Sequence, residues 1–186
     1  GLEAIKKTGV ALPKILRTGL STLDSGKVIV FQMLKESLSL KAAIESAKSS
    51  SERTNFLISM MEILASLHNF GLDQRDPHPE NFLVSDGKIF VIDAQQIYRQ
   101  GKEYLDLSSS LKSLALFFSH IKKIRESEII DSIKHYFSRR DKQFKDSHSK
   151  IILNYFKRFR QKNLKKQLNK VFRDCSEVSV DRGFFR

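Results

Sequence analysis

The chain has 186 residues, a formal net charge of +12 and a hydrophobic content of 40%. This length suffices for one domain with a buried core, or for the larger lobe of a two-lobed enzyme. No run of about 18 apolar residues predicts a membrane-spanning helix, and the N-terminus lacks a secretory signal pattern. The single cysteine, Cys175, excludes an internal disulfide and a multi-cysteine zinc site, so a reducing, intracellular location is expected.

The N-terminal third is expected to contain one helix end, two strands and one helix. The helical pattern of residues 2–8 stops at Gly9, a residue type that often ends helices. The first residue is Gly rather than Met, from which we expect a fragment or a processed boundary. The further expected elements are a strand over 14–18, a turn-rich connection over 20–26, a buried strand over 27–34 and a helix over 38–48.

The remaining residues are expected to be mostly helical. A helix capped by Ser51 is predicted over 52–68, and Gly71 ends it. A loop over 72–81 leads into a hairpin whose strands, 82–84 and 88–92, flank the tight-turn signal Asp86-Gly87. Three further helices are expected over 105–118, 126–138 and 147–169. The order of elements indicates an α+β fold with a largely helical second half.

Positive charge is concentrated near the C-terminus. Between Lys150 and Arg173 the sequence contains many lysines and arginines but no Asp or Glu. Such a segment attracts polyanions, including nucleic acids, anionic lipid headgroups and phosphorylated sugars. A helix face that only meets solvent is the alternative, and charge alone does not choose between them.

Three oxygen-bearing side chains are expected to converge at the open end of the hairpin. Asn81 precedes its first strand and Asp93 follows its second, so the hairpin places them side by side. Asp76 lies five residues before Asn81, in a loop stiffened by Pro77 and Pro79. Asp and Asn are also common turn residues, which is the structural alternative.

Such a group suits phosphoryl transfer. Mg²⁺ prefers hard oxygen ligands and is typically held by one or two carboxylates together with substrate phosphates. A separate carboxylate must accept or orient the proton of the attacking hydroxyl. Asp76 suits the second role, whereas Asn81 and Asp93 suit the first. The histidines His120, His135 and His148 are scattered along the sequence and give no metal-site pattern.

The motif over residues 74–81, Gln-Arg-Asp-Pro-His-Pro-Glu-Asn, resembles the kinase catalytic loop, in which His-Arg-Asp is followed by four residues and then Asn. Residues 91–93, Val-Ile-Asp, stand where kinases carry the metal-binding Asp. Residues 67–71, Leu-His-Asn-Phe-Gly, match the Leu-His-x-x-Gly that ends the preceding helix in kinase-like folds. Gln74 departs from the usual His, a residue that mainly braces the loop.

Neither Asp-Phe-Gly nor Ala-Pro-Glu follows, so the activation segment of protein-substrate kinases is not expected. The segments 90–99 and 104–107 are instead similar to the Kdo and heptose kinase family of bacterial lipopolysaccharide synthesis. The resemblance covers nearly the whole chain and is specific over about 64–107. It implies a protein-kinase-like α+β fold, with 1–34 as a residual N-terminal lobe. The helical C-terminal lobe would span 35–186, with the catalytic loop 74–81 and a basic helical tail.

The resemblance also implies ATP and Mg²⁺ as cofactors. Asp76 would be the catalytic residue, Asn81 and Asp93 would bind the metal, and His78 would lie near phosphate. The strand before Gln32, Met33 and Leu34 resembles the hinge between lobes, whose backbone meets adenine. No Gly-rich loop or strand lysine precedes Gly1; these parts would lie upstream, and Glu3 is the expected ion-pair partner of that lysine.

The function implied is phosphorylation of a sugar hydroxyl, on Kdo or heptose of the lipid A–core glycolipid. The basic helices would then form a landing surface for this anionic glycolipid at the cytoplasmic face of the inner membrane. A kinase of a small soluble alcohol or aminoglycoside is one alternative, although such sites usually favour acidic clefts. A truncated or pseudokinase-like binding protein is another. Specific nucleic-acid binding is not expected, since no base-stacking or groove-reading motif is present.

Overall fold

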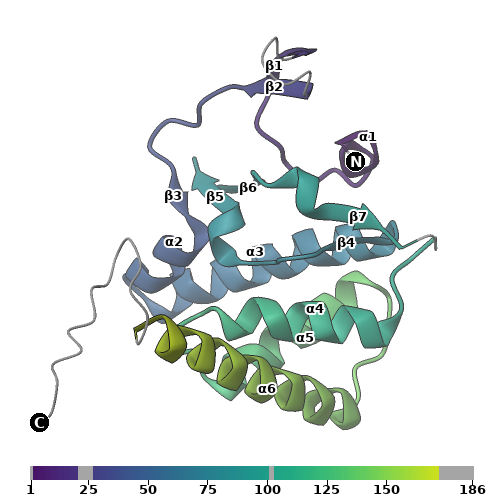
Figure 1. Ribbon diagram of the computed structural model, residues 1–186. Coiled ribbons are helices and arrows are strands. Elements are labelled where there is room, and N and C mark those ends of the chain that lie inside the picture. Colours follow the sequence, from purple (N-terminus) through teal and green to yellow (C-terminus); the bar gives the residue numbers. More distant parts are fainter. Residues whose placement is uncertain (1, 21–26, 101–102, 172–186) are drawn as a thin grey trace, which may run out of the picture.

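The computed structural model describes residues 2–20, 27–100 and 103–171. The expected turn-rich connection over 20–26, apart from Leu20, and Cys175 therefore lie outside the described residues. The described part has the predicted α+β architecture: small antiparallel sheets lie above a layer of helices (Figure 1). None of the helices described is long and apolar enough to cross a lipid bilayer.

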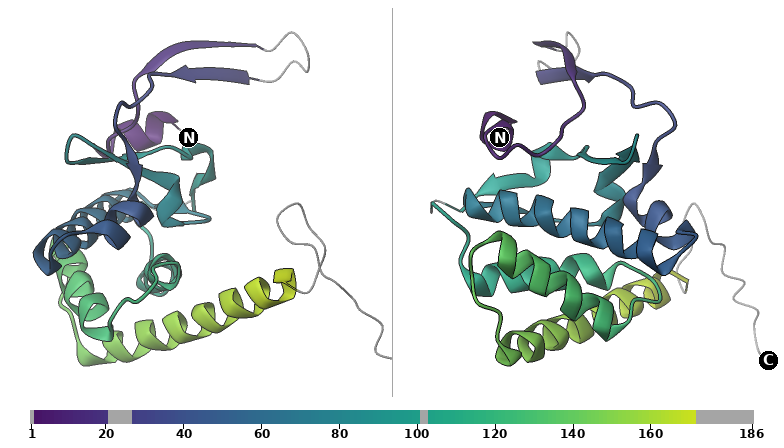
Figure 2. Two further views of the ribbon diagram at one scale, coloured as in Figure 1. Left: turned by 90° about the vertical axis from the view of Figure 1, so that its left-hand side faces the viewer. Right: turned by 180° about the vertical axis from the view of Figure 1, so that it is seen from behind.

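The N-terminal segment forms a short helix and an isolated two-stranded ribbon. Helix α1 (Leu2–Lys6) ends before Gly9, whose φ of 72° is a conformation that glycine adopts without strain. Strands β1 (Ile15–Leu20) and β2 (Lys27–Phe31) pair antiparallel and stand apart from the helical body (Figure 2). The prediction of a buried strand over 27–34 was wrong. Strand β2 ends at Phe31, and Ile29 and Val30, on its opposite faces, are 38% and 44% exposed.

Local sequence signals set both ends of the long helix α3 (Ser50–Asn69). It belongs to a run of three elements: β3 (Leu38–Ser39), α2 (Leu40–Ser46) and α3 itself. The cap of α3 is Ser49 rather than the predicted Ser51: its hydroxyl accepts a hydrogen bond from the backbone N–H of Glu52 at 3.0 Å. The helix ends before Gly71, which has a φ of 65°.

Two small sheets hold the middle of the chain. The hairpin of β5 (Phe82–Ser85) and β6 (Lys88–Val91) pairs with β3 to give a three-stranded sheet. The second sheet joins β4 (Leu72–Gln74) to β7 (Ile97–Arg99). Strand β4 falls in the segment predicted to be a loop, and no strand was predicted at β7, because three residues are too few to show an alternating pattern.

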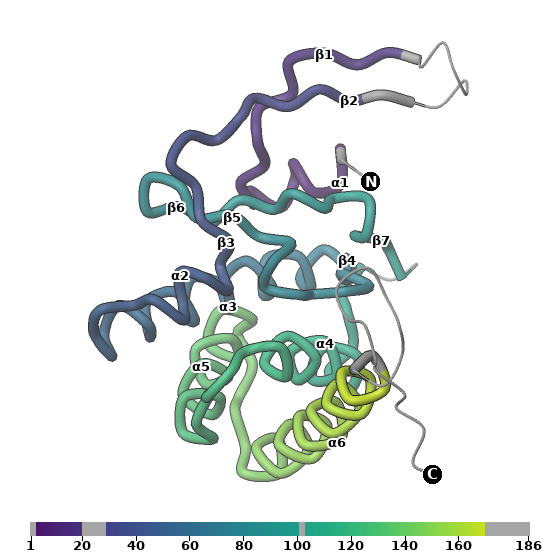
Figure 3. The backbone as a smooth tube through the Cα atoms, turned by 60° about the vertical axis from the view of Figure 1, so that its left-hand side comes forward, coloured from purple at the N-terminus to yellow at the C-terminus, as the bar shows by residue number. Residues whose placement is uncertain are grey.

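Three helices complete the fold: α4 (Leu107–Ser119), α5 (Glu126–Arg139) and α6 (Asp146–Val171). Helix α5 packs on α3, and α6 packs on α4 (Figure 3). The core between the sheets and the helices is rich in aromatic residues. Its largest fully buried side chains include Phe82, Phe117, Phe118, Tyr136 and Phe137.

Candidate active site

The hairpin brings the two predicted metal ligands to one end. Phe82 pairs with Val91 as the last residues of the β5–β6 ladder, and the N–H of Ile92 donates to the carbonyl oxygen of Asn81 at 3.2 Å. Asp93 follows directly. The turn at the other end has positive φ at both Asp86 (48°) and Gly87 (70°), which matches the right-handed strand twist. Asn81 and Asp93 are therefore neighbours at the open end of the hairpin.

Asp76 is tied to the same end by a hydrogen bond. The Nδ2 of Asn81 donates to the backbone carbonyl of Asp76 at 2.9 Å. Between them, the one-turn 3₁₀ helix η1 (Pro79–Asn81) folds the loop back on itself, and its N–H at Asn81 donates to the carbonyl of His78 at 2.8 Å. The bond from Asn81 uses only its nitrogen, so its Oδ1 remains an acceptor.

The donor set fits a magnesium ion. The carboxylates of Asp76 and Asp93 form no hydrogen bond or ion pair with any described residue. With the Oδ1 of Asn81 they provide hard oxygen ligands of the kind Mg²⁺ prefers. No group of three or more His, Cys, Asp or Glu in the described ranges could hold a metal.

His78 meets a histidine that sequence reasoning missed. The rings of His78 and His120 are 4.1 Å apart between centroids, at an interplanar angle of 51°. Burial, followed by the adjacent His78, lowers the pKa of His120 to about 4, so its ring is neutral near pH 7. The two residues are 42 positions apart in the sequence, and no local pattern connects them. Only the packing of α4 brings them together.

Helix α4 runs alongside residues 68–78 and contacts them near its start, in its middle and at its end. Near its start, the N–H of Leu105 donates to the carbonyl of His68 at 2.7 Å. In its middle, the Ser113 hydroxyl donates to the Asp73 carboxylate at 2.8 Å, and at its end lies the His120–His78 contact. This helix therefore positions the loop that carries Asp76.

The N-terminal cap of α4 is Asp106, whose carboxylate accepts from both the backbone N–H and the hydroxyl of Ser109, at 3.0 and 2.9 Å. A negative charge at this position is favourable to the dipole of α4. Gln74, which replaces the usual kinase His, is 2% exposed, and neither polar atom of its amide has a partner among the described residues. Bracing of the loop therefore comes from α4 rather than from the Gln74 side chain.

A buried polar network lies beneath the site. Arg140 donates to the hydroxyl of Tyr136 (2.7 Å), the hydroxyl of Ser110 (2.8 Å), the carbonyl of Leu105 (2.8 Å) and the amide oxygen of Asn69 (2.9 Å). Tyr136 also bonds the Nδ1 of His68 at 2.7 Å. His68 is fully buried, and this burial lowers its pKa. His68 is thus a packed residue at the end of α3.

The predicted nucleotide-contacting residues lie on the N-terminal segment. The N–H of Gln32 donates to the carbonyl of Lys14 at 2.7 Å, and the carbonyl of Leu34 accepts from the Ser37 hydroxyl at 3.1 Å. Met33, 81% exposed, keeps its backbone groups free of partners in the described part of the chain. Helix α1, which carries Glu3, contacts the 3₁₀ helix η2 (Ala94–Gln96) that follows Asp93. The Glu3 side chain pairs with Lys6 at 2.9 Å.

Together, the small sheets above a helical layer and the loop–hairpin between them define a protein-kinase-like α+β fold with a partial N-terminal part. The sequence matches no protein-family model and no curated protein. Among solved structures, the chain is similar to "WaaP in complex with acyl carrier protein", with a TM-score of 0.66 and 18% sequence identity. The similarity covers 87% of this chain and 73% of that chain. At this identity it shows a shared fold.

Proposed function

We propose that the chain is an ATP- and Mg²⁺-dependent phosphotransferase that phosphorylates a sugar hydroxyl of a lipopolysaccharide lipid A–core, on Kdo or heptose. The observation that carries this proposal is the bond from Asn81 to the carbonyl of Asp76, at the hairpin end where Asp93 also lies. Two carboxylates without partners in the described structure flank that bond. The resemblance of residues 64–107 to the Kdo and heptose kinases supplies the substrate class.

Each residue at the hairpin end has one role in this proposal. Asp76, exposed at the loop, orients the acceptor hydroxyl and receives its proton. Asn81 and Asp93 hold the metal ion, which when bound supplies charge neutralisation for the transferred phosphoryl group. His78, kept in place by its contact with His120, faces the phosphates. The backbone of Met33 is the favoured partner for adenine, and Glu3 would pair with a strand lysine.

Helix α6 supplies the surface for an anionic glycolipid. From Lys157 onward it carries exposed basic residues together with Leu164 and Leu168, which are 53% and 57% exposed. Basic residues beside exposed apolar ones favour binding at an anionic membrane surface, here the cytoplasmic face of the inner membrane. The exposed basic residues are Lys157, Arg158, Lys162, Lys165 and Lys166. WaaP was solved in complex with acyl carrier protein. A binding test of α6 can therefore also reveal a protein partner in place of a membrane.

Charge reversal tests this surface. Lys157 pairs with Glu126 at 3.0 Å and Arg160 donates to the carbonyl of Ile121, so both also have structural contacts. The informative variant therefore reverses Arg158, Lys162 and Lys165 together. We expect it to lose binding to vesicles of anionic phospholipid. A matched variant that reverses Lys48, Lys88 and Lys122 should bind normally; equal binding by both variants would refute the landing surface.

The test of the reaction is transfer of labelled phosphate from ATP to a Kdo- or heptose-bearing lipid A. Asp76→Asn should reduce the rate by about 10²–10⁴-fold, the usual contribution of a general base. Asp86→Asn, in the hairpin turn, should keep the rate. Transfer to an aminoglycoside instead would favour the soluble-acceptor alternative, and ATP binding that is absent or indifferent to Mg²⁺ would favour a non-catalytic binding protein.

A further inference from the structure

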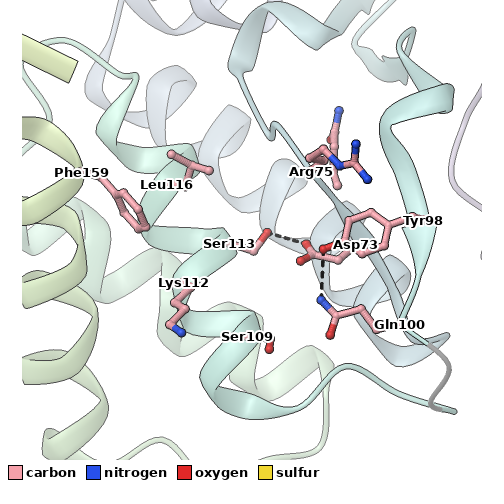
Figure 4. A pocket seen from close by; sticks show the side chains of 10 residues that line it. Asp73, Arg75, Tyr98, Gln100, Ser109, Lys112, Ser113, Leu116 and Phe159 are labelled. Atoms are coloured by element: carbon pink, nitrogen blue, oxygen red, sulfur yellow. Dashed lines mark hydrogen bonds between the residues drawn. The ribbon is translucent and has the colours of Figure 1, made fainter. Parts of the chain in front are cut away.

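A pocket lies directly behind the catalytic loop. It is formed between the β4–β7 pair on one side and helices α4 and α6 on the other, and has a volume of about 240 Å³ (Figure 4). Arg75, the residue before Asp76, lines it, although Asp76 itself does not, so the pocket adjoins the loop that carries the proposed chemistry. Ordinary pockets for drug-sized ligands measure roughly 300–1,000 Å³. This one has room for a single sugar ring.

Two cations line the pocket without a carboxylate partner. The guanidinium carbon of Arg75 lies 5.6 Å from the ring centroid of Tyr98, and the Nζ of Lys112 lies 5.7 Å from that of Tyr155. Neither cation forms an ion pair with any residue in the described ranges. Contact with a ring face positions a cation but leaves its N–H donors free for an anion.

Among the described residues that line the pocket, the one carboxylate is already engaged. Asp73 is 8% exposed; one of its oxygens accepts from Ser113 at 2.8 Å and lies 3.5 Å from the Nε2 of His68. The Asp73 carboxylate is therefore directed mainly toward Ser113 and His68 rather than into the pocket. The two exposed cations, Arg75 and Lys112, leave a net positive charge facing the pocket.

The remaining walls suit a hydroxylated ring. Gln100 and Ser109 provide an amide and a hydroxyl, and the Gln100 Nε2 donates to the Tyr98 hydroxyl at 3.2 Å, so its Oε1 is open as an acceptor. Tyr98 and Phe159 add aromatic surface from opposite sides. A few placed polar groups on an otherwise apolar wall typically fix the orientation of a small ligand.

We propose that this pocket binds an anionic sugar of the acceptor, one that carries a carboxylate or a phosphate, next to Asp76. The inference rests on the proposed function and deepens it by assigning an acceptor subsite. Arg75 and Lys112 contact the anionic group, and Gln100 and Ser109 contact hydroxyls. Because Phe159 belongs to α6, the pocket adjoins the helix that carries the basic surface, so a glycolipid bound there can place one sugar in the pocket.

Binding of small probes to the full chain, without nucleotide, tests the proposal. Isothermal titration would use Kdo as a sugar acid, glucose 6-phosphate as a sugar phosphate and glucose as the neutral comparison. We expect the two anionic probes to bind and glucose to bind much more weakly. Lys112→Gln should weaken the anionic probes about tenfold, the scale of one charge-assisted hydrogen bond. Lys122→Gln, an exposed lysine outside the pocket, should bind as the wild type does.

Amide chemical shifts locate the bound probe, and should move at Tyr98, Gln100 and Lys112. Equal binding by Lys112→Gln, equal affinity for glucose, or no binding would each overturn the subsite. The proposed function is tested separately. A chain that transfers phosphate but binds no anionic probe refutes the subsite alone, whereas a chain that binds the probes but never transfers phosphate refutes the proposed function alone.

Discussion

The side chain of Asn81 donates a hydrogen bond to the backbone carbonyl of Asp76, at 2.9 Å. This bond closes a six-residue loop, 76–81, that contains the buried residues Pro77 and Pro79. It joins the residue proposed to accept a proton to a residue proposed to hold the metal. A shift of one therefore displaces the other.

Replacing Asn81 with Ala should remove both the loop bond and a metal oxygen. Ligand and supporting contacts of a metal site are typically worth about 10–100-fold in affinity or activity. We expect the Mg²⁺ concentration needed for half-maximal transfer to rise by that factor. Asn55→Ala, an exposed asparagine of α3, is the control and should leave the Mg²⁺ dependence unchanged. An unchanged Mg²⁺ dependence in Asn81→Ala would show that Asn81 does not bind the metal.

The hairpin turn depends on glycine at position 87. Gly87 has a φ of +70°, whereas Gly19 does not have positive φ, and an added Cβ meets nothing within 4 Å at either position. Gly87→Ala should therefore destabilise the protein by about 1–2 kcal/mol through backbone strain alone. Gly19→Ala should be neutral or slightly stabilising. Urea unfolding compares them, and equal effects would contradict the turn conformation.

Arg140 is predicted to be a main contributor to stability of the helical layer. It is 6% exposed and has four hydrogen-bond partners, so Arg140→Met leaves several buried polar groups without a hydrogen bond. We expect a loss of at least about 3 kcal/mol, since each unsatisfied group costs about 1–3 kcal/mol. Arg139→Met, at an exposed neighbouring position, should change stability by about 0.5 kcal/mol or less. Similar losses for both variants would rule out the network.

His120 should make the protein less stable in acid. Its pKa falls from an unfolded value near 6.5 to about 4 in the fold, mainly by burial and then by His78. As the pH falls, His120 therefore takes up its proton at a higher pH in the unfolded chain than in the folded one. The stability present above pH 6.5 is lost as the pH falls toward 4. His120→Gln should reduce the difference in melting temperature between pH 7.5 and pH 5. Part of the difference should remain, because His68 has a lowered pKa as well. An unchanged difference would contradict this assignment.

Local signals predicted the elements that position the site. The Asp86-Gly87 turn and the two runs beside it specified the hairpin, and with it the proximity of Asn81 and Asp93. The stop of α3 at Gly71 followed from its backbone freedom. What failed depends on tertiary packing. Whether β2 is buried depends on what covers the ribbon, and an apolar run alone does not reveal it.

The support of the catalytic loop was also beyond local patterns. His120 meets His78 because α4 runs along residues 68–78, a packing arrangement that no spacing in the sequence encodes. The pocket between β7 and α6 likewise combines Tyr98 with Phe159, which are 61 positions apart. The fold and the proximity of the two predicted metal ligands followed from residue order, whereas the residues packed around them did not.

The central claim is that Asp93 and Asn81 hold a metal against the phosphates of ATP. Its most direct test is the ATP affinity of the full chain with and without Mg²⁺, in the wild type, in Asp93→Ala and in the turn control Asp86→Ala. We predict that Mg²⁺ tightens ATP binding in the wild type and in Asp86→Ala, and that this gain disappears in Asp93→Ala. A gain of equal size in all three proteins, or no ATP binding by the wild type, would contradict the account.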